Sequence, residues 1–257
     1  MARWTAFPHI DRHYEYTPAT LKKHWARLHR GDCEPLPKDD AVLGAWIDYH
    51  AGRFQQAAEA GLKAGAAGHS VANKATNIYA NYLEKSESKK LGLFQEVAAR
   101  CEAQQVADPK NANAFYHHAY ALGRYSQGIS VTRALAQGLG GKVRDALAQA
   151  IRLAPKHADA HIALGAFHAE VIDKVGAMIG AMTYGAKRDE GLRLFRRALE
   201  LNPDSAIARV EYANALVMLD GKKALKEAEA LYAQAAAFEP MDAMERLDVE
   251  MARAEIG

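Results

Sequence analysis

The apolar positions of this chain recur at helical intervals, and one order of side-chain sizes returns along it at fixed spacing. In residues 188–206 a small, a large and a small residue and then a proline follow at intervals of four, three and five: Gly191, Phe195, Ala198 and Pro203. The same intervals separate Ala228, Tyr232, Ala235 and Pro240; Val143, Leu147, Ala150 and Pro155; and, more weakly, Val97, Cys101, Gln104 and Pro109. The stretch at 51–65 keeps Ala57, Gly61 and Ala64 without the proline. This repetition indicates an internal repeat.

Each repeat reads as two helices. In residues 157–171, apolar side chains such as Ile162 and Phe167 recur at helical spacing among small residues. The partner helix, 188–201, is predicted to end before Pro203, because proline cannot continue the hydrogen-bond ladder. Each helical hairpin then has an apolar face that it cannot cover alone, so stacked hairpins are expected to form a solenoid.

The predicted elements cover nearly the whole chain. Thr17 and Pro18 favour the start of a first helix, which Gly31 ends. Hairpins are predicted at residues 40–65, 70–107, 111–154, 157–202 and 205–239, with a terminal capping helix at 241–255. The glycines of "GLGGKV", 138–143, are expected to form a flexible turn before a helix, since the phosphate-loop pattern is incomplete.

The fold class predicted is all-α: a right-handed α-solenoid of about five hairpins, with extended loops inside the hairpins and capping helices at the ends. Residues 1–37 are predicted to be an N-terminal capping segment with one basic amphipathic helix. Residues 38–257 are predicted to be a single solenoid domain.

The segments "LGAFHAE" and "RDEGLRLFRRALELNP" resemble a tetratricopeptide repeat, a helix-turn-helix unit of 34 residues. The chain departs from that period because extra residues lie between the two helices of a hairpin, at 126–140 and 173–186. With these inserts, residues from about 71 to 257 resemble the regulators of microtubule dynamics, a family of tetratricopeptide-like proteins. The likeness rests on "ALGRYSQGISVTRALAQGLGGKVRDALAQAIRLAPKHADAHIALGAFHAEV" and "AAAFEPMDAMERLDVEMARAEI". It implies a partner-binding role rather than any chemistry.

Charge and composition narrow the function classes. The 257 residues carry 33 basic and 31 acidic side chains, a formal net charge of +2, which argues against a dedicated nucleic-acid surface. Two distant cysteines fit a reducing compartment rather than a disulfide framework. No apolar run is typical of a signal peptide or an integral membrane segment, so a cytoplasmic protein is expected.

The basic helix near the N-terminus permits two interpretations. Its basic residues are Lys22, Lys23, Arg27 and Arg30, and its apolar residues are Leu21, Trp25 and Leu28. Such a helix is compatible with a membrane surface or nucleic acid. We favour a cap on the solenoid, because Asp32 and Glu34 dilute the basic patch.

Catalysis and metal binding are not favoured, and neither catalytic residues nor cofactors are predicted. His157, His161 and His168, with Glu170 nearby, are compatible with a zinc site, and a metal-dependent enzyme built on them stays open as a third hypothesis. The alternative, that these histidines serve packing, is favoured because His161 and His168 take the repeat's bulky positions. Cys101 is expected to be buried, and no catalytic signature surrounds Cys33.

The remaining candidate site is the inner groove. In register, the first helix of each hairpin places several polar and amphipathic residues near the concave side: Asn77, Asn81, Asn113, Tyr116, Tyr120, Arg124, Asn214 and Met218. Asparagine amides both donate to and accept from a peptide backbone, and tyrosines supply amphipathic contact area. The alternative is that some of these residues complete the helix packing.

The second insert offers an apolar flap. Its candidate residues are Met178, Ile179, Met182 and Tyr184. Methionines suit adaptable contacts, although the same side chains also suit padding of the extended hairpin.

The predicted function is a non-catalytic scaffold or adaptor that binds a protein or peptide in the groove. The alternative is a carrier of a small apolar molecule or lipid, with a cavity closed by the inserts 126–140 and 173–186.

Overall fold

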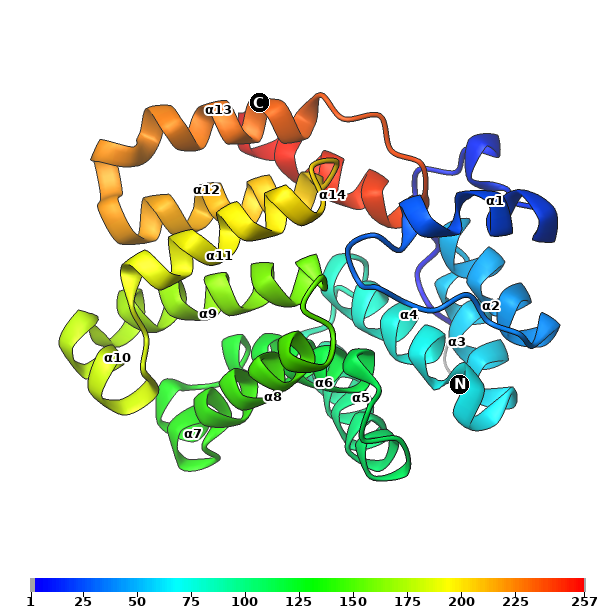
Figure 1. Ribbon diagram of the computed structural model, residues 1–257, viewed down its shortest axis with the longest axis horizontal. Helices are drawn as coiled ribbons and strands as arrows, with labels where there is room; N and C mark the ends of the chain where they lie inside the picture. Colours follow the sequence, from blue (N-terminus) through cyan, green and yellow to red (C-terminus); the bar gives the residue numbers. More distant parts are fainter. Residues whose placement is uncertain (1–2, 257) are drawn as a thin grey trace. The chain divides into compact units, whose positions relative to one another are not determined.

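The computed structural model describes residues 3–256, which form helices joined by turns and include no strand (Figure 1). The all-α prediction is therefore confirmed. The five predicted hairpins are α2 (Asp40–His50) with α3 (Phe54–Lys63), α4 (His69–Tyr82) with α5 (Glu87–Ala107), α6 (Ala112–Gln127) with α8 (Leu139–Leu153), α9 (Ala158–Val175) with α11 (Arg188–Leu201), and α12 (Ala206–Asp220) with α13 (Leu225–Ala236). The terminal helices are α1 (Pro18–Leu28) and α14 (Ala243–Ile256).

Side-chain caps account for where several of these helices start. Thr17 and Thr20 form a reciprocal capping box at the start of α1. Ser86, Asn111 and Ser205 accept a backbone N–H in the first turns of α5, α6 and α12, respectively. Each cap satisfies a donor that the helix itself leaves unpaired.

Backbone contacts divide the chain into two compact units. Unit 1 comprises the described residues up to 29, residues 34–153 and residues 241–244. Unit 2 comprises residues 30–33, 154–240 and the described residues from 245 onward. The single domain expected from residue 38 onward stays a prediction.

Unit 1 is built around α4, which packs against α2, α3, α5 and α6. A core of buried side chains, including Phe94, Val97 and Tyr125, fills the space between α4, α5, α6 and α8. Cys101 belongs to this core as expected, and its burial raises the pKa of the thiol to about 12, so the sulfur stays protonated and inert. Of the apolar residues of α1, Leu21 and Trp25 are buried and Leu28 is half-buried.

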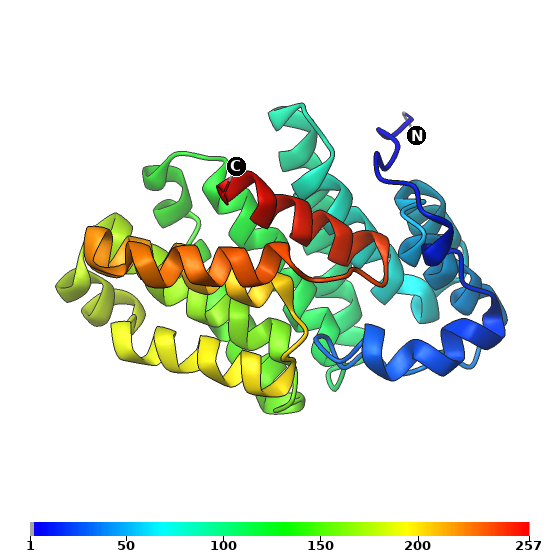
Figure 2. The same ribbon diagram turned by 90° about the horizontal axis from the view of Figure 1, so that it is seen from above.

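Unit 2 contains the hairpins α9/α11 and α12/α13. Figure 1 shows α12 and α13 running antiparallel beside each other, and in the view from above of Figure 2 α13 lies in front of α12. Phe195 of α11 is fully buried and stacks on Tyr212 of α12, with ring centroids 5.3 Å apart. Val249 and Ala252 of α14 pack into a cluster with Val210 and Ala235, so this end of the last hairpin is covered.

The inserts differ from the expected loops because each contains a short helix, α7 (Val131–Ala136) or α10 (Ala177–Tyr184). The predicted glycine turn at 138–143 is also corrected. Gly138 alone takes a positive φ, of 64°, and Gly140 and Gly141 already belong to α8. Burial of Leu139 and Val143 in unit 1 outweighs the weak helix propensity of these two glycines.

Candidate binding pocket

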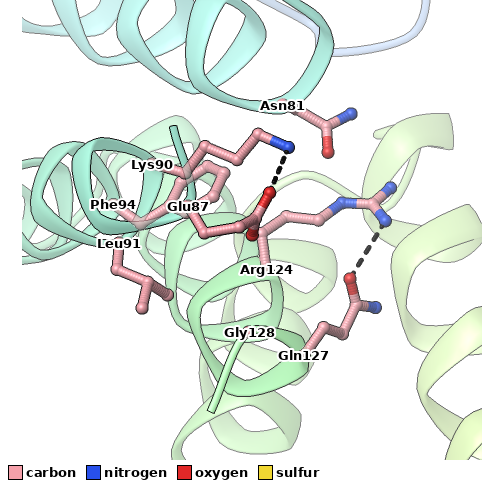
Figure 3. Close-up of a pocket in the computed structure, with 8 residues that line it drawn as sticks. All are labelled: Asn81, Glu87, Lys90, Leu91, Phe94, Arg124, Gln127 and Gly128. Atoms are coloured by element: carbon pink, nitrogen blue, oxygen red, sulfur yellow. Dashed lines mark hydrogen bonds and ion pairs between the residues drawn. The ribbon is translucent and has the colours of Figure 1, made fainter. Parts of the chain in front are cut away.

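The structure brings two of the eight groove candidates together at one pocket of unit 1. Asn81, near the end of α4, and Arg124, in the last turn of α6, both line it. The pocket has a volume of about 160 Å³ and is open to solvent. Its lining residues come from α4, α5 and the end of α6: Asn81, Glu87, Lys90, Leu91, Phe94, Arg124, Gln127 and Gly128 (Figure 3).

Charged and amide groups surround the pocket mouth. Lys90 Nζ lies 2.9 Å from Glu87 Oε1, and Arg124 Nη1 donates to Gln127 Oε1 at 3.2 Å. In Figure 3 the carboxamide of Asn81 extends toward the same space as the lysine and arginine head groups. Two cations against one carboxylate leave a net positive charge at the rim.

Arg124 is positioned by its own helix. Its guanidinium carbon lies 5.4 Å from the ring centroid of Tyr120, one turn earlier on α6, which is a cation–π arrangement. Tyr120 is therefore a supporting residue of the pocket, and it was among the groove candidates.

The turn between α4 and α5 holds Lys90 and Glu87 in place. Glu84 Oε2 accepts from the Tyr79 hydroxyl at 2.8 Å, and its Oε1 accepts from the Ser86 N–H at 2.9 Å. The Ser86 N–H, as the main cause, and the Tyr79 hydroxyl lower the pKa of Glu84, so this carboxylate stays ionised and keeps the turn closed.

Sequence reasoning missed the residues contributed by α5. Lys90 and Leu91 lie on the second helix of a hairpin, whereas the groove was predicted from first helices alone. The available signal was the Ser86 cap, which fixes where α5 begins and so places its first turns beside the end of α4.

Three other groove candidates are buried within unit 1. Asn77 donates to the carbonyl of His117 at 3.3 Å, and Asn113 donates to Glu34 Oε2 at 2.6 Å. Tyr116 is also buried. These positions support the alternative reading in which such residues complete helix packing.

The last two groove candidates lie on α12 of unit 2. Asn214 accepts a short hydrogen bond from the hydroxyl of Tyr232 on α13, which ties the two helices of its own hairpin. Met218 is 41% exposed. Neither residue is among those that line the pocket.

The flap candidates lie on or beside the solvent-facing side of α10. Met178 is 74% and Met182 83% exposed, Ile179 is also exposed, and Tyr184 is half-buried. The helix packs against α9, with the buried Gly180 close to Val171. Both methionine side chains face solvent, so they do not pack inside the extended hairpin.

We expect the double substitution Met178→Ala, Met182→Ala to leave the melting temperature within about 2 °C of the parent, because surface changes of this kind stay within about 0.5 kcal/mol. Differential scanning calorimetry measures this directly. A fall of 5 °C or more would restore the padding interpretation.

The histidines of α9 engage the backbone. His157 Nδ1 accepts from the Ala160 N–H, His161 Nδ1 lies 2.9 Å from the His157 carbonyl, and His168 Nδ1 accepts from the Lys187 N–H. Burial lowers the pKa of His161 and of His168. Among residues 3–256, no group of three or more histidine, cysteine, aspartate or glutamate side chains is arranged to hold a metal ion.

None of the helices in the described part of the chain combines the length and apolarity needed to cross a bilayer.

Comparison with known proteins defines the fold class. The chain is similar to the crystal structure of a tetratricopeptide-repeat protein of Thermus thermophilus, with a TM-score of 0.59 and 19% sequence identity. The likeness covers 84% of this chain and 98% of that one. No protein-family model and no curated protein matches the sequence. The protein is therefore an all-α, tetratricopeptide-like solenoid protein, and the resemblance to the regulators of microtubule dynamics stays a prediction.

Proposed function

We propose that this protein is a non-catalytic scaffold that binds a peptide segment of a partner protein, and that the pocket formed by α4, α5 and α6 is a principal contact. The observation that carries the proposal is the convergence of Asn81, Lys90 and Arg124 from three packed helices on one open pocket. Because these helices are fixed by a shared core, little ordering entropy is lost when a ligand binds.

The chemistry of the rim favours an anionic group. A carboxylate can accept from the guanidinium of Arg124 in a bidentate manner, which is among the stronger polar contacts in proteins. The Asn81 amide can donate to the same group or to the adjacent peptide backbone. Leu91 and Phe94 supply an apolar wall for a neighbouring side chain. The pocket therefore suits an acidic residue followed or preceded by an apolar one.

The size of the pocket favours a peptide side chain over a carried ligand. At about 160 Å³ it is smaller than the ~300–1,000 Å³ of typical small-molecule sites. The carrier alternative has no supporting observation at this site.

Selection from a displayed library of linear peptides tests the proposal. We expect enrichment of peptides with aspartate or glutamate beside an apolar residue. Arg124→Ala should weaken binding of a labelled, selected peptide at least tenfold, equivalent to about 1.4 kcal/mol. Fluorescence anisotropy measures the affinity.

Arg133→Ala is the matched control, because Arg133 is exposed on α7 and is not among the residues lining the pocket. It should leave the affinity unchanged. Equal affinities for the parent and the Arg124→Ala protein, with both folded, would refute the assignment of this pocket.

A further inference from the structure

A buried cluster of three ionisable side chains, His29, His50 and Asp242, joins three distant parts of unit 1. His50, at the end of α2, lies with Nδ1 2.6 Å from Oδ2 of Asp242. Its other ring nitrogen, Nε2, lies 3.2 Å from Nε2 of His29, the residue that follows α1. The three side chains are only 1–4% exposed.

Aromatic rings enclose this cluster. Trp25 stacks on His29 with ring centroids 4.0 Å apart, and Trp46 stacks on His50 at 5.9 Å. The two tryptophans meet edge to face at 5.8 Å. Since indole rings exclude water, a charge added to either histidine is poorly solvated.

The geometry sets how many protons the two rings can hold. An ionised carboxylate only accepts hydrogen bonds, so His50 Nδ1 carries the hydrogen that is donated to Asp242. The contact between the two Nε2 atoms needs one hydrogen, carried by either ring. One imidazolium is therefore compatible with the contact. Two are not, because each Nε2 would then carry a hydrogen and the two would repel.

Both acidic and basic groups lie near the two histidines of this cluster. The carboxylate of Asp242 favours the first cation. The ammonium of Lys74 on α4 disfavours a second cation here by like-charge repulsion. It lies 5.9 Å from the Trp46 ring and 5.4 Å from the Tyr49 ring. The ring of His24 also lies near this site, with its centroid 6.0 Å from that of Tyr16.

The segment that contains Asp242, residues 241–244, has further contacts in unit 1. The hydroxyl of Tyr16 donates to the carbonyl of Met241 at 2.8 Å, and the hydroxyl of Tyr49 lies 2.9 Å from the sulfur of Met244. Neither tyrosine changes charge between pH 5 and 8 in the ordinary case. Between those values the histidines are the groups here that respond to acid.

We propose that His29, His50 and Asp242 form a pH-sensitive latch that holds residues 241–244 on α1 and α2. Near neutral pH the shared hydrogen closes it. On acidification the second of the two histidine rings is also protonated to an imidazolium. This breaks the contact between the two Nε2 atoms and releases the segment. By linkage, the stability supplied by the contact is present while at most one of the two rings is protonated, and it is lost when the second ring takes up a proton.

Tryptophan fluorescence tests the latch locally. The three tryptophans of the chain, Trp4, Trp25 and Trp46, all lie in unit 1, and Trp4→Phe leaves the two at the latch. In this background, titration from pH 8 to pH 5 should red-shift the emission. Over the same range hydrogen exchange at residues 241–244, corrected for its intrinsic pH dependence, should accelerate at least tenfold.

His29→Gln is the decisive variant. A glutamine amide can donate to His50 Nε2 but does not titrate, so the acid transition should disappear while the emission at pH 8 is kept. His13→Gln is the matched control, because the His13 side chain is 89% exposed, and it should keep the transition. Persistence of the transition in a folded His29→Gln protein would overturn the proposal.

A second measurement needs no substitution. Long-range ¹⁵N–¹H spectra of the histidine rings at pH 7.5 should show a hydrogen on Nδ1 of His50. A His50 ring with a bare Nδ1 would contradict the proposed hydrogen-bond chain, whatever the variants show.

Discussion

Gly68→Ala is expected to lower the free energy of unfolding by about 3 kcal/mol, the upper part of the range for overpacked cores. Gly68 precedes α4 with φ −95° and ψ 0°, values open to alanine, so backbone strain is not the cause. A Cβ atom there would collide with the carbonyl oxygen of Gly61 on α3, and it would lie 2.8 Å from that residue's Cα. The obstacle is backbone, so relief requires α3 and α4 to separate.

The reciprocal position shows the same constraint. A Cβ on Gly61 would lie 2.6 Å from the Gly68 carbonyl oxygen and 3.0 Å from the backbone nitrogen of Ala72. The two glycines let the backbones of consecutive hairpins touch. Urea denaturation followed by circular dichroism at 222 nm measures the cost.

Gly92→Ala is the matched control, since it makes the same chemical change within α5. A Cβ on Gly92 meets nothing within 4 Å, so the gain in helix propensity should raise stability by about 0.5–1 kcal/mol. The two substitutions are thus expected to have opposite signs. A neutral or stabilising Gly68→Ala would show that the close approach of α3 and α4 is not required.

Phe195→Ala is expected to cost about 3–5 kcal/mol, the usual range for removing a buried phenylalanine. Phe195 is fully buried, stacks on Tyr212, and would lie 2.9 Å from a Cβ at Gly165. Its ring therefore fills the junction of α9, α11 and α12, and alanine leaves a cavity that the neighbouring helices cannot readily close.

Phe195→Leu separates lost volume from lost stacking. Leucine refills most of the cavity, so its cost should be less than half that of alanine. The loss should appear in circular dichroism, which follows both units, because unit 2 has no tryptophan to report it. A loss below about 1 kcal/mol for Phe195→Ala would show that this junction is loosely packed.

The candidate site was predictable in part. Asn77 and Asn81 are one helical turn apart on α4 and share a face by spacing, yet Asn77 is buried against α6 and Asn81 lines the pocket. Sequence periodicity gives the face of a helix. It does not show how far along that face a neighbouring helix extends. Asn77 lies where α6 covers α4, and Asn81 lies beyond it.

The order of side-chain sizes, the caps and the prolines were enough to predict the five hairpins and their approximate ends, because each of them acts within a few residues. The repeat also predicted that Cys101 would be buried, as it is. The tertiary structure alone decided that α5 completes the pocket, that the inserts contain helices, and that His29, His50 and Asp242 meet. His50 and Asp242 are 192 positions apart, and contacts at such separations depend on how helices cross and rotate, which local spacing does not record.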